Sequence, residues 1–261
     1  MRIVTWNINS IRLRVKQVTS FIKKYKVDLI CLQETKTINK DFPLKAFYKE
    51  GFNYCHYRGE KSYNGVAILS KIPFKSMGYR EWNKVKESRH VYVTLNNNIT
   101  LHNFYIPAGG DIPDITQNSK FKYKLDFMQE MIKFFKKSDA NKKILVGDLN
   151  IAPGVNDVWS HKQLTKVVSH TPIEINYFNQ LLKVGKWHDV IRLKSQKDEK
   201  LYSWWSYRNK DWKKSNRGRR LDHILISKDL IKYVGAIKIF KEIRDSTKPS
   251  DHVPVMLDIN K

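Results

Sequence analysis

The stretch KILVGDLN, residues 143–150, is an apolar run that stops at a glycine and presents Asp148 and Asn150 directly after it. A short aliphatic run bounded by a turn signal is typical of a buried strand. The two polar side chains therefore stand where a buried strand ends. Such a strand belongs in a sheet packed against other elements, and loops on a rigid scaffold often carry function.

Strand-like runs and amphipathic stretches alternate along the chain. Apolar residues at helical spacing predict helices after NSIRLR, along Phe121 to Phe135, and from Ile173 to Leu182. No linker rich in Pro, Gly or Ser divides the chain, so residues 1–261 are expected to form one α/β domain. Strands are predicted for RIVTWN, LICL, GVAILS, HVYVTL, ITLHNFYI, ILVGD, LDHILIS, AIKIF and VPVMLDI.

The composition is that of a folded protein with a polyanionic partner. Hydrophobic residues make up 41% of the chain, which excludes a disordered protein. The 49 Lys and Arg residues outnumber the 25 Asp and Glu residues and give a formal charge of +24. Because phosphate neutralisation releases counterions, this charge favours nucleic acid as the partner. Two alternatives could also explain the charge. One is a Lys-rich surface that only contacts solvent, and the other is a peripheral protein that binds anionic lipid.

Membrane association and secretion receive little support from the sequence. There is no basic amphipathic helix with a bulky apolar face, no long apolar span and no lipidation signal. MRIVTWNINS alternates like a strand and lacks the apolar core of a secretory signal. Cys31 and Cys55 form neither a disulfide framework nor a zinc spacing, so we expect a reducing cytoplasm and no membrane partner.

Polar side chains stand at several other predicted strand ends. Taken singly, such residues are usually turn formers or helix caps. Taken together, carboxylates, carboxamides, a phenol and an imidazole suit a hard-cation site, because Mg²⁺ prefers oxygen ligands and shares them with phosphate. The set comprises Asn7, Glu34, Tyr105, Asp148, Asn150, Asp222, Asp251 and His252.

Other chemistries lack their motifs. The chain has no G-x-S-x-G, no G-K-[ST], no H-E-x-x-H and no C-x-x-C, so a serine hydrolase, a nucleotide switch and a zinc enzyme lose support. The motifs that are present resemble those of the exonuclease III type of apurinic/apyrimidinic endonuclease, within the endonuclease/exonuclease/phosphatase superfamily. They span nearly the whole chain in family order and are WNINSIR, LQETK, NGVAILS, GDLNIAP, SWWSYR, RGRRLDHILIS and SDHVPV.

The resemblance implies a four-layer α/β sandwich of two mixed β-sheets packed face to face with helices outside. It also implies a site at one edge, where loops from both sheets meet. The implied cofactor is Mg²⁺, with Mn²⁺ as a substitute. The resemblance implies that Glu34 is the principal ligand of this metal ion, with Asn7 beside it. Asp148 would activate or position the attacking water, and Asn150 would hold that water or a phosphate oxygen.

The remaining site roles also follow from the resemblance. His252 would bond a non-bridging phosphate oxygen, with Asp222 fixing its tautomer and favouring its charged form. Tyr105 would contact the scissile phosphate, and Asp251 would complete the metal shell or a second cation site. The implied metal-associated set is Asn7, Glu34, Asp148, Asn150, Asp251 and His252. His252 is the one histidine given a role, and the others, among them His90, His102 and His223, are expected to be ordinary.

The substrate side shows two departures from better-known members. Ala108 stands where several carry Asn or Gln, and Arg219 stands where an apolar residue often walls the abasic-sugar pocket, leaving Trp204 and Leu221 as the apolar wall. Because neighbouring strand residues face opposite ways, Trp205 is expected in the core. The basic stretches RNKDWKKSNRGRR and SKFKYK are interpreted as phosphate-contacting loops, with substrate contacts expected at Arg217, Arg219 and Arg220.

The function implied is that of a DNA-repair phosphodiesterase. It would incise double-stranded DNA 5′ to abasic sites and remove 3′ nucleotides or blocking groups, as a monomer that associates with the bacterial nucleoid through DNA. Two classes of alternative stay open. One is a superfamily relative that hydrolyses RNA, a phosphoinositide or a sphingolipid phosphoester. The other is a catalytically silent DNA-binding module.

Overall fold

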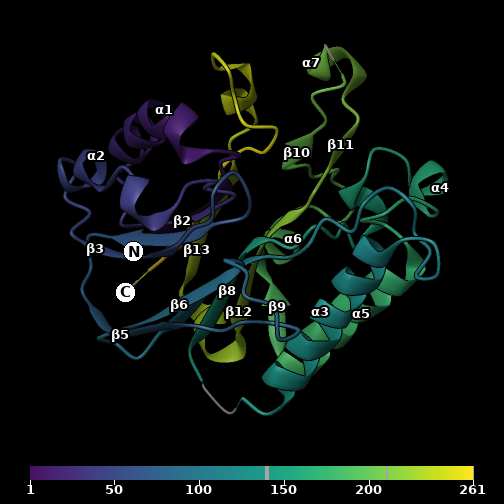
Figure 1. Cartoon of the computed structure of the whole chain (residues 1–261), viewed down its shortest axis with the longest axis horizontal. Helices are drawn as coiled ribbons and strands as arrows, with labels where there is room; N and C mark the ends of the chain where they lie inside the picture. Colours follow the sequence, from purple (N-terminus) through teal and green to yellow (C-terminus); the bar gives the residue numbers. More distant parts are fainter. Residues whose placement is uncertain (139–140, 210, 261) are drawn as a thin grey trace.

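Two six-stranded mixed sheets lie face to face in the computed structural model, which describes residues 1–138, 141–209 and 211–260 (Figure 1). The first sheet contains, in order across it, β13 (Val234–Ile239), β14 (Val255–Ile259), β1 (Arg2–Asn7), β2 (Leu29–Gln33), β4 (Val66–Ser70) and β3 (Tyr54–Arg58). The second contains β5 (Phe74–Tyr79), β6 (His90–Leu95), β7 (Thr100–Tyr105), β8 (Lys143–Asp148), β12 (Asp222–Ser227) and β9 (Trp187–Asp189). A two-stranded sheet pairs β10 (Trp204–Trp205) with β11 (Gly218–Arg219).

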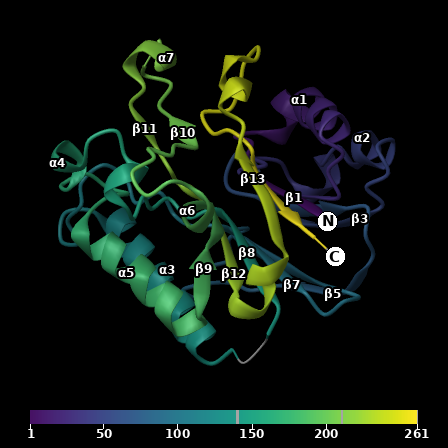
Figure 2. The same cartoon turned by 180° about the vertical axis from the view of Figure 1, so that it is seen from behind.

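Helices cover the outer faces of both sheets and complete the predicted four-layer α/β sandwich (Figures 1 and 2). The first sheet packs against α1 (Ile11–Lys24) and α2 (Leu44–Tyr48), and the second against α3 (Ser119–Lys136) and α5 (Pro172–Gly185). The shorter helices are α4 (His161–Leu164), α6 (Val190–Lys194) and α7 (Trp212–Ser215). The 3-10 turns are η1 (Asn39–Asp41), η2 (Val155–Asp157), η3 (Lys228–Tyr233) and η4 (Lys241–Asp245).

The strand β8 shows why its sequence is continuously apolar. Ile144 and Val146 face the cluster between the two sheets, and Leu145 faces the cluster beneath α3 and α5. Successive residues of a strand point to opposite faces. All three side chains are fully buried, so both faces of the strand are covered. Both faces of the middle of β8 therefore require apolar residues, and its polar side chains, Lys143 and Asp148, stand at its two ends.

The structure adds elements that the sequence patterns did not predict. The unpredicted strands β3, β5, β9 and β11 are short or carry exposed side chains. The stretch SKFKYK begins α3 and is not a loop as predicted, because its Phe121 and the following Leu125 face the core. No helix in the described ranges is long and apolar enough to cross a membrane.

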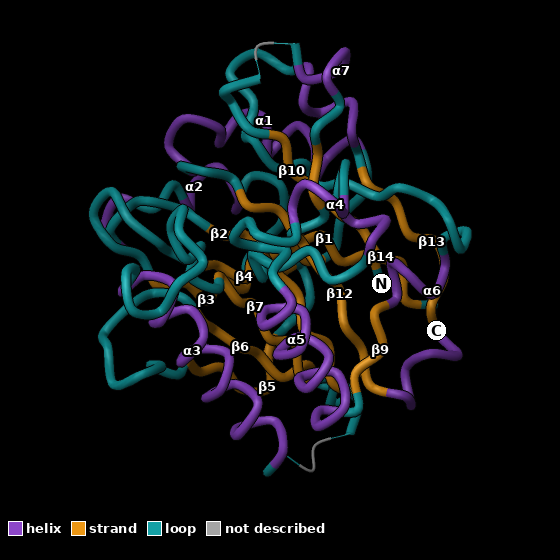
Figure 3. The backbone as a smooth tube through the Cα atoms, turned by 90° about the vertical axis from the view of Figure 1, so that its right-hand side faces the viewer, coloured by secondary structure: helices purple, strands orange, loops and turns teal. Residues whose placement is uncertain are grey.

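The two ends of the described chain lie side by side in the first sheet (Figure 3). Strand β14 pairs antiparallel with β1, and the amino group of Met1 donates a 2.7 Å hydrogen bond to the carbonyl of Ile259. Strand β1 pairs on its other side with β2, in parallel. The first and last parts of the sequence therefore build the centre of the first sheet together.

Candidate active site

Polar side chains from both sheets meet at one edge of the sandwich. Asn7 ends β1, and Glu34 follows β2, which runs parallel to β1. In the second sheet Asp148 stands directly opposite Tyr105 of β7 and Asp222 of β12. Residues opposite one another on neighbouring strands share a face. The ends of β1, β2, β7, β8 and β12 therefore present their polar side chains to the same space.

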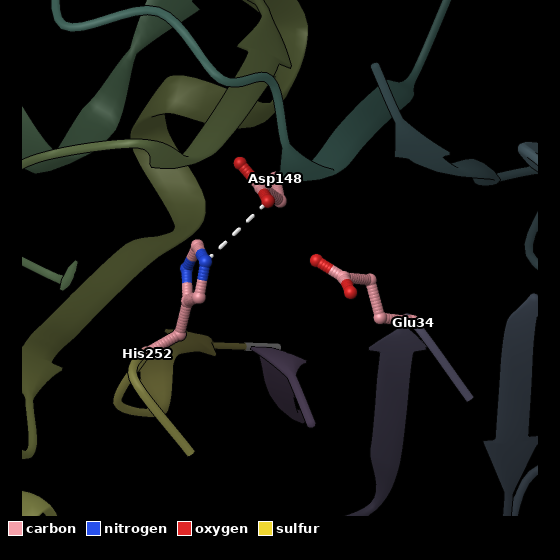
Figure 4. Close-up of side chains that lie close together, drawn as sticks. All are labelled: Glu34, Asp148 and His252. Carbon is pink, nitrogen blue, oxygen red and sulfur yellow. Dashed lines mark ion pairs between the residues drawn. The ribbon is translucent and has the colours of Figure 1, made fainter. Parts of the chain in front are cut away.

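Glu34, Asp148 and His252 form the closest group in this space (Figure 4). One ligand atom from each lies within 4.8 Å of the others, and His252 Nε2 lies 3.6 Å from Asp148 Oδ2. Asn7 Nδ2 bridges the two carboxylates, donating to Glu34 Oε1 at 2.8 Å and to Asp148 Oδ2 at 2.9 Å. Lys36 Nζ lies 2.7 Å from Glu34 Oε2. This group is a candidate metal-binding site.

The imidazole of His252 is held between two carboxylates. Its Nδ1 lies 2.8 Å from Asp222 Oδ2, as the resemblance implied, and its other nitrogen faces Asp148. Burial alone would lower the pKa of His252, but Asp222 and Asp148 reverse this and raise it. Burial raises the pKa of Asp148, against the opposing charge of His252. The site thus combines a charged imidazole with a carboxylate that binds protons readily.

Asn150 and Tyr105 flank Asp148. The backbone at Asn150 adopts φ 52°, which turns its amide N–H back to Asp148 Oδ1 at 2.9 Å. Its Nδ2 donates to Asp148 Oδ2 at 3.2 Å and to the carbonyl of Ile106 at 2.9 Å. Burial, followed by the charges of Glu34 and Asp148, raises the pKa of Tyr105. The phenol therefore stays protonated and can donate a hydrogen bond into the site.

Asp251 lies beside this group but points elsewhere. Its Oδ1 accepts from Asn9 Nδ2 at 3.0 Å, and its Oδ2 accepts from Trp204 Nε1 at 2.9 Å. The structure does not bring it into the group formed by Glu34, Asp148 and His252. Both of its oxygens have partners, so the geometry favours a role in fixing the indole. A metal role for Asp251 stays a prediction.

The wall beside the site is built by the small β10–β11 sheet. Trp204 pairs with Arg219 on one side and forms a bridge with His252 on the other. Trp204 is half-buried, whereas Trp205 is fully buried in a separate core cluster, which confirms the predicted alternation. Leu221 packs against Trp204 from below. Trp204 and Leu221 thus form an apolar surface next to His252.

Arg220 does not lie where the sequence interpretation put it. It is 1% exposed, and its guanidinium forms ion pairs with Asp157 at 2.7 Å and Asp189 at 2.8 Å. These pairs leave it in the interior, out of reach of DNA, so the prediction of a substrate contact at Arg220 is wrong. Arg217 is exposed and lies 4.8 Å from the ring of Trp159.

The two basic stretches differ in structure. RNKDWKKSNRGRR forms the projecting turn around α7 in Figures 1 and 2, although its Lys210 lies outside the described residues. In SKFKYK, by contrast, Lys124 is fully buried in an ion pair with Glu174. Its Nζ also donates to the carbonyls of Asn150 at 2.7 Å and Ala108 at 3.3 Å. Lys124 therefore supports the site from beneath and cannot contact phosphate.

Sequence reasoning missed the polar layer beneath the site. Gln33 Nε2 donates to Thr5 Oγ1 at 2.9 Å and to Asn103 Oδ1 at 2.6 Å, between the two sheets. Ser250 Oγ donates to the carbonyl of Asn7 at 2.7 Å and accepts from the amide of His252 at 3.2 Å. The serine of the S-D-H motif was the available signal. This layer holds the ends of both sheets in fixed relation.

Three of the histidines that were expected to be ordinary, His90, His102 and His223, take no part in the site. His90 Nε2 lies 3.1 Å from His102 Nδ1 inside the second sheet. His223 Nε2 lies 2.7 Å from the carbonyl of Ile151, on the opposite face of β12 from Asp222. All three are buried. The prediction that they are ordinary core residues agrees with these contacts.

Comparisons with known proteins give the same family along the whole chain. The model of the Endonuclease/Exonuclease/phosphatase family matches residues 4–252. An exodeoxyribonuclease III of Haemophilus influenzae is 32% identical, with 98% of each chain covered. Two solved structures superpose with a TM-score of 0.92 and full coverage of both chains, an AP endonuclease from Archaeoglobus fulgidus at 29% identity and a 3′ phosphatase from Neisseria bound to a product DNA hairpin at 28%. The chain belongs to the Endonuclease/Exonuclease/phosphatase family, and its resemblance to the exonuclease III type is confirmed.

Proposed function

We propose that this chain is a metal-dependent DNA-repair phosphodiesterase that incises DNA 5′ to abasic sites and removes 3′ nucleotides or blocking groups. The observation that carries the proposal is the convergence of Glu34, Asp148 and His252 within 4.8 Å. Similarity to an exodeoxyribonuclease III, an AP endonuclease and a DNA-bound 3′ phosphatase supports DNA as the substrate. The formal charge of +24 supports a polyanion.

The donor set fits a hard divalent cation. Glu34 and Asp148 offer carboxylate oxygens, which Mg²⁺ prefers and Mn²⁺ also accepts. His252 is a poor ligand, because Asp222 engages its Nδ1 and the raised pKa favours the protonated ring. We therefore assign the metal to the oxygens of Glu34 and Asp148, with Asn7 orienting both. The bound ion would polarise the phosphate and stabilise its developing charge.

The protein side chains supply alignment and proton transfer. The oxygen of Asp148 that does not hold the metal accepts a proton from the attacking water, which Asn150 helps to orient. The charged His252 donates from Nε2 to a non-bridging phosphate oxygen, and Tyr105 donates to the same phosphate. Water adds to phosphorus, the bond from phosphorus to the 3′ oxygen breaks, and a proton passes to that oxygen. No covalent intermediate is needed.

The DNA contacts are assigned to the wall and the projecting turn. Trp204 and Leu221 offer an apolar surface for an extruded sugar next to His252. Arg217 and the lysines of α7 carry charge on the projecting turn that contains α7 in Figure 1. We further propose that the chain acts as a monomer in the reducing cytoplasm; both cysteines are free and one is buried.

A comparison of substrates in one assay tests the proposal. Purified protein is incubated with Mg²⁺ and duplexes that carry an abasic site, a 3′-phosphate or a recessed 3′-hydroxyl, with single-stranded RNA and lipid headgroup esters in parallel. The expected result is cleavage of the three DNA substrates with little action on RNA or lipid esters. Faster cleavage of RNA or lipid esters would favour the superfamily alternatives. DNA binding without cleavage in Mg²⁺ or Mn²⁺ would favour the silent module.

A further inference from the structure

Arg219 lies two strands away from His252, with Trp204 between them. Strand β11 places it directly opposite Trp204, and Trp204 forms a bridge with His252 on its other side. Residues opposite one another on adjacent strands point to the same face. Arg219, Trp204 and His252 therefore share one face. Adjacent strands are spaced about 4.8 Å apart, which puts the backbone of Arg219 about 10 Å from that of His252.

The guanidinium of Arg219 is held firmly but lacks a counter-ion. Its Nη1 donates to the carbonyl of Val168 at 3.0 Å and to Ser169 Oγ at 2.8 Å. Its centre lies 5.3 Å from the ring of Trp204. Nε is buried without a hydrogen-bond partner, and no carboxylate of the described residues forms an ion pair with the group. Arg220, the next residue, has two such carboxylates.

A partly buried guanidinium without a counter-ion is unfavourable, and a bound anion would relieve that cost. Burial lowers the pKa of Arg219, and the charge of Glu174 acts the other way, although Glu174 is itself paired with Lys124. The carbonyl, hydroxyl and indole contacts fix the planar fork before any ligand arrives. A fixed guanidinium with free donor capacity is suited to a carboxylate or a phosphate.

We infer that Arg219 is a specificity-determining residue that binds a second anionic group of the substrate, on the fragment beyond the phosphate held by His252. The inference rests on the proposed function. Two sources supply this chemistry. One is a 3′ end whose phosphate is esterified to a small carboxylate, such as glycolate. The other is the backbone phosphate on the 3′ side of an abasic residue. Arg219 takes no part in the hydrolysis itself.

Matched substrates separate charge from size. The first pair is a recessed duplex whose 3′-phosphate carries either a carboxymethyl ester or the neutral 2-hydroxyethyl ester. The second pair is a duplex ending in an abasic residue with or without a further 3′-phosphate. A charge-assisted hydrogen bond is worth about 1.5–3 kcal/mol, so kcat/KM should favour the charged member of a pair by about 10- to 100-fold in the wild type. The first pair reports a carboxylate and the second a phosphate.

Three variants test the residue. Arg219→Leu should bring the ratio of kcat/KM within each pair close to one, with the loss falling on the charged member. Arg219→Lys should keep part of the preference, because it retains charge without the fork. Arg80→Leu is the control, since Arg80 pairs with Glu130 on the outer side of α3. It should leave every ratio unchanged.

The outcomes distinguish the inference from the proposed function. A wild-type ratio near one for both pairs would overturn the inference. An equal loss on all substrates in Arg219→Leu would do the same and would mark Arg219 as a clamp on Val168 and Ser169. If the wild type cleaves none of the substrates, the proposed function fails. The inference is then decided by dissociation constants of the same pairs in EDTA, where equal affinity for charged and neutral members would overturn it.

Discussion

Asp222 Oδ2 lies 2.8 Å from Nδ1 of His252, on the opposite side of the imidazole from the Nε2 that faces Asp148. Asp222 stands directly opposite Asp148 in neighbouring strands of the second sheet, whereas His252 precedes β14 of the first. The contact therefore joins the two sheets through the site. It also leaves Nε2 as the nitrogen that can reach a phosphate.

Asp222→Asn should lower kcat by about 10- to 1,000-fold and narrow the pH range of activity. Asp222 raises the pKa of His252, so its removal should move the loss of activity at alkaline pH to a lower pH. A pH profile of kcat for both proteins measures this. An unchanged alkaline limb would show that the charge of His252 does not depend on Asp222.

Asp148→Asn should abolish proton transfer from the attacking water while preserving the fold. The amide oxygen can still accept from Asn7, so the melting temperature should change little. Turnover of the abasic duplex should fall by about 100- to 10,000-fold. Single-turnover cleavage and DNA affinity measured side by side check this. Near-wild-type cleavage would remove Asp148 from its assigned role.

Glu34→Gln should weaken the response to Mg²⁺. Loss of one anionic oxygen ligand should raise the Mg²⁺ concentration for half-maximal activity by about tenfold or more. A metal titration of the initial rate measures the effect, with Glu242→Gln, an exposed substitution on η4, as the control. Identical titrations for wild type and Glu34→Gln would mean that the metal binds elsewhere.

Lys124→Met should destabilise the protein because Lys124 is buried in an ion pair. Lys124 is paired with Glu174, and both side chains are fully buried, so the substitution leaves a buried carboxylate without its cation. Such losses cost about 3–5 kcal/mol. Chemical denaturation should show this decrease in the free energy of unfolding. Lys122→Met on the exposed side of α3 should change it by less than about 0.5 kcal/mol.

Stability should fall as the pH drops from about 6.5 toward 4. Burial and the charge of Arg220 lower the pKa of His223 to about 4, and burial lowers that of His102 to about 3. Unfolded histidines have a pKa of about 6.5, so in this window the unfolded chain binds protons that the folded chain does not. Each buried histidine should remove about 1.4 kcal/mol per pH unit.

The variant that tests this pH dependence is His223→Gln. His223 is fully buried. His223→Gln should reduce the slope of the unfolding free energy between pH 6 and 4.5 relative to the wild type. Equal slopes in the two proteins would show that His223 is protonated in the folded state.

The main candidate site residues could be found from the sequence because each follows a readable pattern. Glu34 and Asp148 come directly after apolar runs, and a strand buried on both faces has no other place for a carboxylate. That these residues converge could be predicted only from the family resemblance. The spacing of Asn7 and His252 along the chain does not reveal that β1 and β14 are neighbours.

The apolar residues of the wall, Trp204 and Leu221, were expected from the family resemblance, but the β10–β11 pairing that places them was not. Strands β10 and β11 contain two residues each, too few for any periodicity to emerge. Arg219 and Arg220 are chemically identical neighbours, yet one lies beside Trp204 and the other is buried against Asp157, which is 63 positions away. Burial of a charged residue depends on such distant partners. This is why the sequence misplaced Arg220 and Lys124.

The pairing of β14 with β1 has a consequence for folding. Asn7 and His252 lie far apart in the sequence, and β14 completes the sheet that positions both. A chain truncated before residue 250 would keep Glu34 and Asp148 but would lack the imidazole, and the side of β1 that pairs with β14 would be left without its partner strand. The candidate site therefore cannot form from any local segment and depends on long-range strand pairing.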